Sequence, residues 1–432
     1  MKNNTYGGFG VEREDKDFAL GPIPKDHRKG FLSMFFVMLG FTFFSSSMVA
    51  GGTLGQGIGM KEFIVVVLIG NLILGIYAAL LGLIGAKTGL TTHLLTSFSF
   101  GIKGSFLTSF LLSAIQVGWF GVGVATFSLM VNKATGISLP ILIILSGILM
   151  TSTAYWGMKA LTVLSIVAVP AIVLLGSFSV SKATADVGGF AALMQLEPTE
   201  SISYTLALSI CIGSFIGGAT LTADFTRFSK NKKDGFLTTF IAYFIGNSLM
   251  FTFGMIGTLA IGYADISDVM VAQGLIIPAI IVLGLNIWST NDNSLYTSGL
   301  GFSHITKLPK DKIVLFNGML GTLLSMVVYN NFISWLTILG STIPSIGAII
   351  LADYFLLRRK NGYNQKEVKN INVNAIVSWA VGIVAANLLP GIPPVNAIVA
   401  AVMVYIAATM LEQAATRGNI GKDEVTESIK NI

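Results

Sequence analysis

Long apolar stretches separated by short polar connections fill the chain from Phe31 to about residue 411. A run of about 20 apolar residues is long enough to cross a bilayer as a helix. A further short apolar and aromatic stretch, Thr91–Gly101, is expected to be an interfacial or re-entrant piece before the third span. The pattern predicts twelve membrane-spanning helices, at approximately 31–57, 62–86, 104–132, 138–156, 159–180, 203–228, 235–263, 270–303, 313–329, 332–356, 373–391 and 394–411.

The sixth predicted span carries an interruption, in which Gly213, Gly217 and Gly218 surround Ser214 and Phe215. A broken helix is tolerated at membrane depth only where the freed backbone groups line a cavity or pack on protein. In secondary transporters such breaks build the substrate site near the middle of the bilayer. The alternative interpretation is a continuous helix whose small residues allow a close helix crossing.

The first predicted span is interrupted as well, by three serines at positions 45–47 followed by Gly51 and Gly52. Interruptions at matching positions of two halves point to an inverted repeat with its binding site between them. We therefore expect spans 1–5, about residues 31–180, and spans 6–10, about residues 203–356, to be the two repeats. Spans 11 and 12, about 373–411, would be appended, and residues 31–411 would form one transporter body.

Composition and charge support a polytopic membrane protein. Of the 432 residues, 53% are hydrophobic and 11% are charged, well below the roughly 25% charged residues of soluble domains. With both ends placed in the cytoplasm, 24 of the 27 Lys and Arg residues fall on the inner side, as the positive-inside rule requires. Residues 1–30 and 412–432 would then be cytoplasmic tails, the first mostly irregular. The single cysteine, Cys211, excludes a disulfide within the chain and a cysteine-cluster metal site.

Polar and aromatic residues in the third span suggest a binding site. Gln116 and Trp119 are three residues apart and therefore share a helix face. An amide can donate and accept hydrogen bonds at the edge of a polar heterocycle, and Trp119 can stack on its face, opposite Phe215. The alternatives are an interhelical hydrogen bond for Gln116 and an interfacial anchor or packing residue for Trp119.

The eighth span is unusually polar for a membrane helix. Such groups usually face a cavity or pathway. The hydroxyl groups of Ser289 and Thr290, together with backbone carbonyls, are hard oxygen ligands suited to sodium, although each hydroxyl could instead bond the carbonyl four residues earlier. Asp292 could bind substrate, hold a proton or pair structurally. At the inner ends of spans 6 and 10, we interpret Asp224, Arg227 and Asp353 as gate or anchoring charges.

The chain carries the long motifs GPIPKDHRKG, VMLGFTFFSSSM, GAKTGLTTHLL, QVGWFGVGVA, GATLTADFTRF, ADISDVM, GLNIWSTNDN and VVYNNFISWL. These motifs resemble those of the bacterial cytosine permeases of the nucleobase:cation symporter-1 family. The resemblance runs from about Gly21 to Asn396. It implies an all-α polytopic membrane protein with twelve transmembrane helices, a LeuT-like five-plus-five inverted repeat and broken helices 1 and 6. It also implies inward transport of cytosine with sodium.

The resemblance also assigns roles to individual residues. It implies a substrate site formed by Gln116, Trp119, Gly213, Ser214, Phe215, Gly217 and an eighth-helix amide, either Asn291 or Asn293, with Asn291 preferred. We add Asp292 to this set. The implied sodium ligands are the carbonyl oxygens near Gly40 and Phe43 and that of Asn286, with the hydroxyls of Ser289 and Thr290. In the hydantoin-type relatives the glutamine follows the tryptophan by four, whereas here Gln116 precedes Trp119 by three, which favours a smaller pyrimidine over hydantoins.

We therefore expect a secondary carrier that is not an enzyme and that has cytosine, sodium and the lipid bilayer as partners. We expect no nucleic-acid partner, a monomer, and a location in the bacterial inner membrane. The closest alternative is a proton-coupled carrier of purines or a related heterocycle, for which Asp292 is the candidate proton site. A lipid-modifying membrane enzyme lacks a nucleophile or metal motif in this sequence, and paired broken helices fit a closed site better than an open channel.

Overall fold

The computed structural model describes residues 17–331, 339–357 and 368–430, with side chains up to residue 415. The named elements of the described residues are all helices, with α1 to α7 in the first half and α9 to η3 in the second. The first half holds η1 (Lys25–His27), α1 (Phe31–Thr42), α2 (Ser45–Gly57), α3 (Met60–Thr88), α4 (Thr92–Phe100), α5 (Gly104–Thr135), α6 (Leu139–Tyr155) and α7 (Met158–Asp186).

The short helix α8 (Phe190–Leu193) precedes the second half, and two further helices follow that half. The second half holds α9 (Tyr204–Gly213), α10 (Ile216–Thr220), α11 (Ala223–Thr226), α12 (Lys232–Ile241), the π-helical turn η2 (Ala242–Asn247), α13 (Ser248–Ile261), α14 (Ile266–Ala272), α15 (Ile276–Thr306), α16 (Lys310–Asn330), α18 (Pro344–Ala352) and the π-helical turn η3 (Asp353–Leu357). The last two helices are α19 (Val373–Leu388) and α20 (Pro393–Lys430).

The predicted spans correspond to helices of this structure. Seven described helical segments are long and apolar enough to cross a membrane, and the bent pair α1 and α2 makes an eighth. The remaining predicted spans correspond to the shorter apolar helices α6 and α19, the broken α9–α11 segment and the polar helix α15. The first seven residues of the predicted span 332–356 lie outside the described residues.

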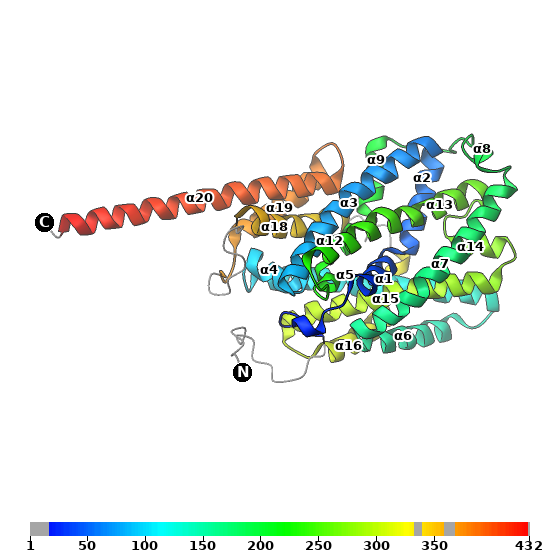
Figure 1. Ribbon diagram of the computed structural model, residues 1–432, viewed down its shortest axis with the longest axis horizontal. Helices are drawn as coiled ribbons and strands as arrows, with labels where there is room; N and C mark the ends of the chain where they lie inside the picture. The colour runs from blue at the N-terminus through cyan, green and yellow to red at the C-terminus, as the bar shows by residue number, and fades with distance from the viewer. Residues whose placement is uncertain (1–16, 332–338, 358–367, 431–432) are drawn as a thin grey trace.

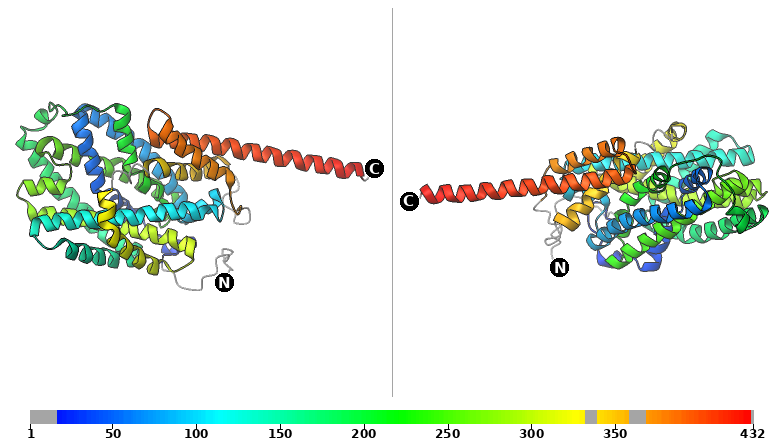
Figure 2. Two further views of the ribbon diagram at one scale, coloured as in Figure 1. Left: turned by 180° about the vertical axis from the view of Figure 1, so that it is seen from behind. Right: turned by 90° about the horizontal axis from the view of Figure 1, so that it is seen from above.

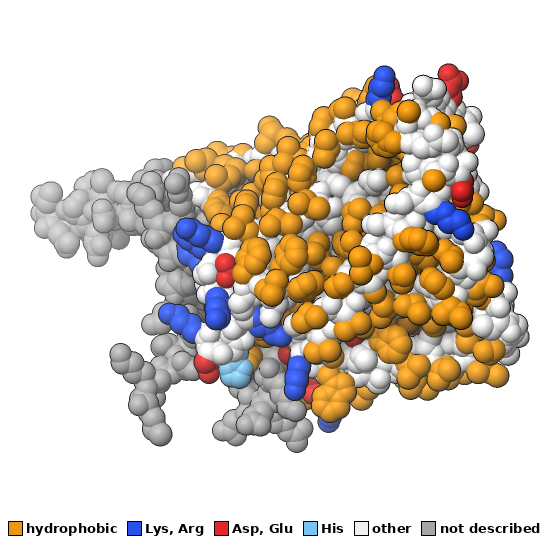
Figure 3. Space-filling model, turned by 45° about the vertical axis from the view of Figure 1, so that its right-hand side comes forward, with side chains coloured by type: hydrophobic (Ala, Val, Ile, Leu, Met, Phe, Trp, Pro, Cys, Tyr) orange, Lys and Arg blue, Asp and Glu red, His pale blue; other side chains and the backbone are white. Residues whose placement is uncertain are grey.

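The body has two distinct ends (Figure 1). Helix α4 and the described start of the chain lie at one end, which we call the tail end, and α8 and α14 lie at the opposite end, the far end. Helices α19 and α20 pack on each other and on α18 along one side of the body (Figure 2). On the face seen in Figure 3, hydrophobic side chains cover the middle, and Lys and Arg side chains lie toward the ends.

The first span breaks at Phe43 and Phe44, where α1 and α2 meet at an angle of 53°. The prediction placed this interruption at the serines and at Gly51 and Gly52, and that position was wrong, because α2 is continuous through all of them. A Cβ atom at Gly51 would collide with the backbone of Phe251 on α13. Gly51 therefore serves a close helix crossing, which is the role that small residues commonly play in membranes.

The sixth span breaks as predicted, between Gly213 at the end of α9 and Ile216 at the start of α10. Ser214 and Phe215 form the connection, and a second irregular turn at Leu221 and Thr222 separates α10 from α11. Here the glycines do lie at the break itself. The two breaks together leave unpaired backbone groups inside the body, where protein surrounds them.

Both predicted tails differ from simple polar extensions. Residues 17–30 are mostly irregular, as expected, but they pack on the body, and Ala19 and Ile23 are buried. At the other end of the chain, the last span was expected to end near residue 411. Instead α20 continues as one helix to Lys430 and projects beyond the body (Figure 1).

Candidate functional site

A small cavity lies between the two helix breaks. Its volume is about 40 Å³, several times the roughly 10–15 Å³ that one water molecule requires. The breaks contribute most of its wall, and α5 and α15 close the other sides. The lining residues are Phe41, Phe44, Gln116, Trp119, Gly213, Ser214, Phe215, Ile216, Gly217, Gly218, Thr290, Ser294 and Leu339.

Aromatic rings form the cavity's main surfaces. Trp119 and Phe215, predicted as the stacking pair, both line it, and the ring of Phe44 stands edge-on to each, at centroid distances of 5.1 Å and 5.8 Å. Phe41 also contacts Phe215 edge-on, at 5.2 Å. Sequence reasoning missed Phe44, although it directly precedes the serines at which an interruption of the first span was identified.

The π-helical turn η2 supports Phe215 from behind. The ring of Tyr243 meets the ring of Phe215 at 5.5 Å, with the two planes inclined by 62°. A Cβ atom at Gly218 would lie only 2.6 Å from the Phe215 ring, so the glycine allows the ring to fold against α10. A π-turn inside a helix often occurs at a functional site. Here it sets the position of an aromatic wall of the cavity.

The Gln116 side chain is buried at 4% exposure and lines the cavity. Its amide has no hydrogen-bond partner among the described residues, whereas buried amides are normally paired. Ser214, predicted beside it in the site, also lines the cavity, but its hydroxyl donates to the Cys211 carbonyl at 3.0 Å. Gly213 and Gly217 contribute backbone to the opposite wall. Among the described lining residues, the Gln116 amide and the Ser294 hydroxyl are therefore the polar side-chain groups available to a ligand.

The structure does not bring Asn291 and Asp292 to the cavity. The Asn291 amide donates to the Phe120 carbonyl at 3.2 Å and to Met150 Sδ at 3.1 Å, on the side of α15 that faces α5 and α6. The cavity is lined instead by Thr290 and Ser294, which are four residues apart and share a helix face. Because the residues in this part of α15 are nearly all polar, the sequence pattern did not show that they lie on two different faces of the helix.

Asp292 takes part in side-chain hydrogen bonds between α15 and α6, away from the cavity. The Thr153 hydroxyl donates to Asp292 Oδ1 at 2.7 Å, and Trp288 Nε1 donates to Thr153 Oγ1 at the same distance. Of the three roles considered for Asp292, this geometry matches the structural pair. Asn293, the second candidate amide, donates to the Ser289 carbonyl at 2.8 Å.

Oxygen atoms from α1 and α15 gather beside the cavity. Ser289 Oγ lies 3.4 Å from the Gly40 carbonyl oxygen and 3.0 Å from that of Asn286. Thr290 Oγ1 is also 3.0 Å from the Asn286 carbonyl. Because α1 ends at Thr42, with Phe43 as its cap, the last carbonyls of that helix lack intrahelical partners. The hydroxyls do bond within their own helix, yet the set supplies the hard oxygen donors that suit a sodium ion.

Asn286 contributes a contact that the sequence did not indicate. Its Oδ1 atom accepts hydrogen bonds from both the backbone N–H and the hydroxyl of Ser45, each at 3.0 Å. The start of α2 is thereby tied to the same turn of α15 that carries the oxygen cluster. A ligand at these oxygens would thus contact α1 directly and would be linked to α2 through the Asn286 side chain.

Comparison with known protein families gives a match over most of the chain. A family model for permeases of cytosine/purines, uracil, thiamine and allantoin matches residues 22–410. The cytosine permease of Escherichia coli strain K12 is 53% identical over 394 residues, which are 91% of this chain and 94% of that protein. The hydantoin permease of Microbacterium maritypicum is 23% identical over 74% of each chain.

A solved structure shares the fold. Mhp1, a nucleobase-cation-symport-1 family transporter in a closed conformation with bromovinylhydantoin bound, superposes with a TM-score of 0.80 at 19% identity. The match covers 91% of this chain and 95% of Mhp1. The predicted fold, a LeuT-like five-plus-five inverted repeat with broken helices 1 and 6, is confirmed. The protein is a multi-pass membrane transporter and not an enzyme.

The lateral position of Asp292 leads to a prediction that needs no transport assay. Replacement of Asp292 by Ala removes the acceptor of the Thr153 hydroxyl and should cost about 1–3 kcal/mol of stability. Asp292→Asn keeps an oxygen acceptor and should cost less. Thermal unfolding of the detergent-purified protein measures both. Equal melting temperatures for wild type and Asp292→Ala would contradict the structural role.

Proposed function

The chain belongs to the family of permeases for cytosine, purines, uracil, thiamine and allantoin, and on that basis we propose that it imports cytosine together with sodium. In this proposal the carrier works by alternating access, in which the cavity between the two breaks opens first to one side of the membrane and then to the other. Its partners are cytosine, one or more sodium ions and the surrounding lipid. It acts as a monomer and binds no nucleic acid.

The observation that carries the proposal is the unpaired amide of Gln116 inside an aromatic cavity. Cytosine is a flat ring whose edge holds both donors and acceptors, and an amide offers both in return. Trp119, Phe44 and Phe215 supply aromatic surface, and stacking a base on an aromatic ring is worth about 1–3 kcal/mol. The identity to the Escherichia coli cytosine permease supports cytosine among the family's substrates.

Sodium coupling is supported by the donor set beside the cavity. The carbonyls of Gly40 and Asn286 and the hydroxyls of Ser289 and Thr290 are neutral oxygen ligands from two segments. We include the Phe43 carbonyl as a fifth ligand, because Phe43 lies at the broken end of α1. Sodium bound there would hold the end of α1 against α15, close to Thr290 in the cavity wall. Asp292 is bonded to Thr153 and lies away from the cavity, so it belongs neither to the proposed ion ligands nor to the cavity wall.

We further propose that the tail end faces the cytoplasm of a bacterial cell and the far end faces outward across the inner membrane. The excess of Lys and Arg on the predicted inner side supports this orientation. At the far end a second cavity of about 650 Å³ reaches Ser45 and Ser46, next to the first break. This cavity would be the route by which cytosine approaches from outside.

The driving force is sufficient for accumulation. One positive charge moving down a potential of 100 mV yields about 2.3 kcal/mol. A tenfold sodium gradient adds about 1.4 kcal/mol. With one sodium per cytosine, the sum of roughly 3.7 kcal/mol supports a few hundred-fold accumulation of the neutral base.

The first test is uptake of labelled cytosine into proteoliposomes under an inward sodium gradient, with potassium as the matched replacement. We expect uptake only with sodium, competed by unlabelled cytosine more strongly than by uracil or adenine. Sodium-independent uptake that follows a pH gradient would instead support a proton-coupled carrier. Competition by adenine above that by cytosine would indicate a purine carrier.

Removal of the cavity's amide or aromatic surface should weaken binding without loss of folded protein. Gln116→Leu, Trp119→Ala and Phe215→Ala should each raise the Kd for cytosine about tenfold or more, through lost hydrogen bonds or lost stacking. Trp156→Ala is the matched control, because Trp156 is 67% exposed and does not line the cavity. Equilibrium binding to the purified protein measures these constants. Wild-type affinity in all three cavity variants would contradict the site.

The ion site is tested by comparing two threonines on one helix. Thr290 and Thr306 both donate hydrogen bonds within α15, but only Thr290 lies beside the Gly40 and Asn286 carbonyls. Thr290→Ala should raise the sodium concentration for half-maximal uptake several-fold, because it removes one oxygen ligand. Thr306→Ala should leave it unchanged. The same sodium dependence in both variants would exclude the Thr290 hydroxyl as a ligand.

A further inference from the structure

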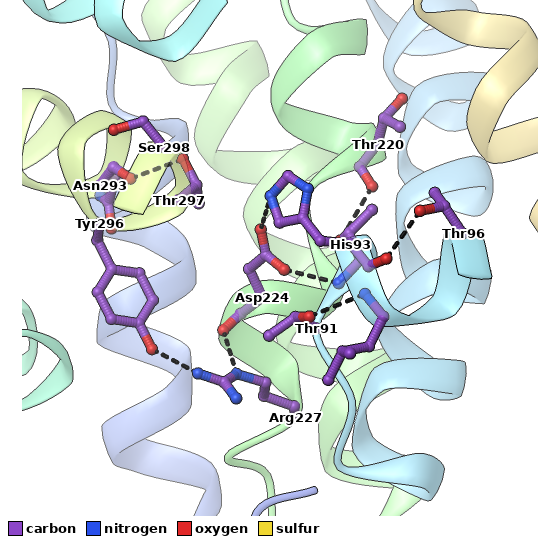
Figure 4. A network of polar contacts seen from close by, with 12 residues as sticks. Thr91, His93, Thr96, Thr220, Asp224, Arg227, Asn293, Tyr296, Thr297 and Ser298 are labelled. Atoms are coloured by element: carbon purple, nitrogen blue, oxygen red, sulfur yellow. Dashed lines mark hydrogen bonds and ion pairs between the residues drawn. The ribbon is translucent and has the colours of Figure 1, made fainter. Parts of the chain in front are cut away.

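A cluster of fully buried polar groups closes the tail end of the body (Figure 4). At its centre are Asp224 and Arg227, on and just after α11, where the sixth span ends; both are 0% exposed. Their sequence positions suggested gate or anchoring charges that could pair with each other. The structure instead directs the two side chains toward different partners, which come from both halves of the chain and from the amino-terminal segment.

Asp224 joins the sixth span to α4 of the first half. Its Oδ1 atom accepts the Thr92 backbone N–H at 2.7 Å, at the first residue of α4. A carboxylate at this position also interacts favourably with the positive end of the helix dipole. The Nε2 atom of His93 lies 3.7 Å from Asp224 Oδ2, and the imidazole is fully buried (Figure 4).

The Arg227 guanidinium points the other way and binds two separate segments, the amino-terminal segment and α15. Its Nη2 atom donates to the Asp17 carbonyl at 2.6 Å and to the Tyr296 hydroxyl of α15 at 2.9 Å. Its Nη1 atom donates to the Phe18 carbonyl at 2.8 Å. A buried guanidinium needs such a full set of partners, because leaving a buried charge unpaired is strongly destabilising. The amino-terminal segment thus supplies two of the acceptors that allow Arg227 to be buried.

The segment Asp17–Lys29, which we call the latch, is also fastened to both sides of this cluster. The Asp17 carboxylate pairs with Lys310 at the start of α16 at 2.6 Å. Ile23 N–H donates to the Gly89 carbonyl at the end of α3 at 2.9 Å. At its other end, Lys29 Nζ donates to Thr162 Oγ1 of α7 at 2.7 Å, and burial lowers the pKa of Lys29, opposed by the charge of Asp17.

These contacts bridge two groups of helices. Helices α3, α9–α11, α12 and η2 pack together as one group, and α5, α6, α15 and α16 pack together as another. The latch contacts α3 in the first group and α16 in the second, and Arg227 links α11 to α15. A rigid-body rotation that separates the groups at the tail end must therefore break the bonds of the latch and of Arg227.

We propose that the latch is an integral part of the inner gate, with Arg227 as the positioning residue that holds it closed. This inference rests on the proposed alternating access. Opening toward the tail end would separate Arg227 from Tyr296 and from the carbonyls of Asp17 and Phe18, and water entering the gap would solvate the freed charge. The latch thereby stabilises the state in which the cavity is closed to the cytoplasm.

The test measures the accessibility of two reporter cysteines in a background where the buried Cys211 is replaced by Ala. Thr297→Cys lies on α15 beside the cluster and reports opening at the tail end (Figure 4). Thr126→Cys lines the far-end cavity and reports opening at the far end. Each is labelled by a maleimide in membrane vesicles of known orientation, without cytosine or sodium, so that the readout does not depend on the proposed substrate.

Three changes weaken the latch, and two have matched controls. Arg227→Gln is compared with Lys230→Gln, an exposed lysine three residues later. Removal of residues 2–22 is compared with removal of residues 2–16, which leaves Asp17, Phe18 and the rest of the latch in place. Asp17→Asn is the mildest change, because it breaks the pair with Lys310 but keeps the carbonyl that Arg227 uses.

In Arg227→Gln and in the 2–22 deletion we expect at least tenfold faster labelling of Thr297→Cys and slower labelling of Thr126→Cys. Each lost charge-assisted hydrogen bond shifts an equilibrium by roughly a factor of ten, and both changes remove more than one. Asp17→Asn should shift both labelling rates in the same directions, and the control variants should shift neither.

Unchanged labelling of both reporters in folded latch variants would overturn the proposal. If Arg227→Gln fails to fold, the 2–22 deletion and Asp17→Asn decide between the outcomes. If the labelling rates shift as expected but the wild-type protein shows no sodium-driven uptake of cytosine, the proposed substrate is refuted and the proposed gate is not.

Discussion

The backbone of a membrane protein cannot leave its polar groups unpaired in lipid, and this structure depends on how that constraint is met at two places. Spans one and six are broken at Phe43–Phe44 and at Ser214–Phe215, deep in the body. Both breaks face inward, where neighbouring helices exclude lipid. The groups that the breaks free are then available to a ligand, so the cavity is a direct consequence of the two broken helices.

The polar residues of α15 lie on two faces of the helix, and each face places its polar groups against protein or the cavity and away from lipid. One face carries Thr290 and Ser294 to the cavity, next to the carbonyl and hydroxyl oxygens that could hold an ion. The other face sends Asn291 and Asp292 into hydrogen bonds with α5 and α6. The second set locks α15 into its surroundings. A helix held by these hydrogen bonds can present a site of defined geometry.

The two ends of the body differ in a way that suits a carrier. The far end holds a large cavity that reaches the first break, whereas at the tail end Asp224, Arg227 and His93 are fully buried among partners. Buried charges are costly unless paired, so the hydrogen bonds of Arg227 and the bond from Thr92 N–H to Asp224 Oδ1 stabilise one arrangement strongly and penalise partial opening. Such a network favours a transition between two discrete states over gradual deformation.

The sequence by itself determined the span pattern, the repeat, the broken sixth helix and the cavity residues Gln116, Trp119 and Phe215, because hydropathy, glycine clusters and long motifs are local signals. It misplaced the first break, since Gly51 serves a helix crossing that only the position of α13 reveals. It also grouped Asn291 and Asp292 with the site, because their helix face is defined by α5 and α6. The packing of residues 17–30 under Arg227 was decided by tertiary structure alone: backbone carbonyls accept that guanidinium, and every residue type offers the same carbonyl.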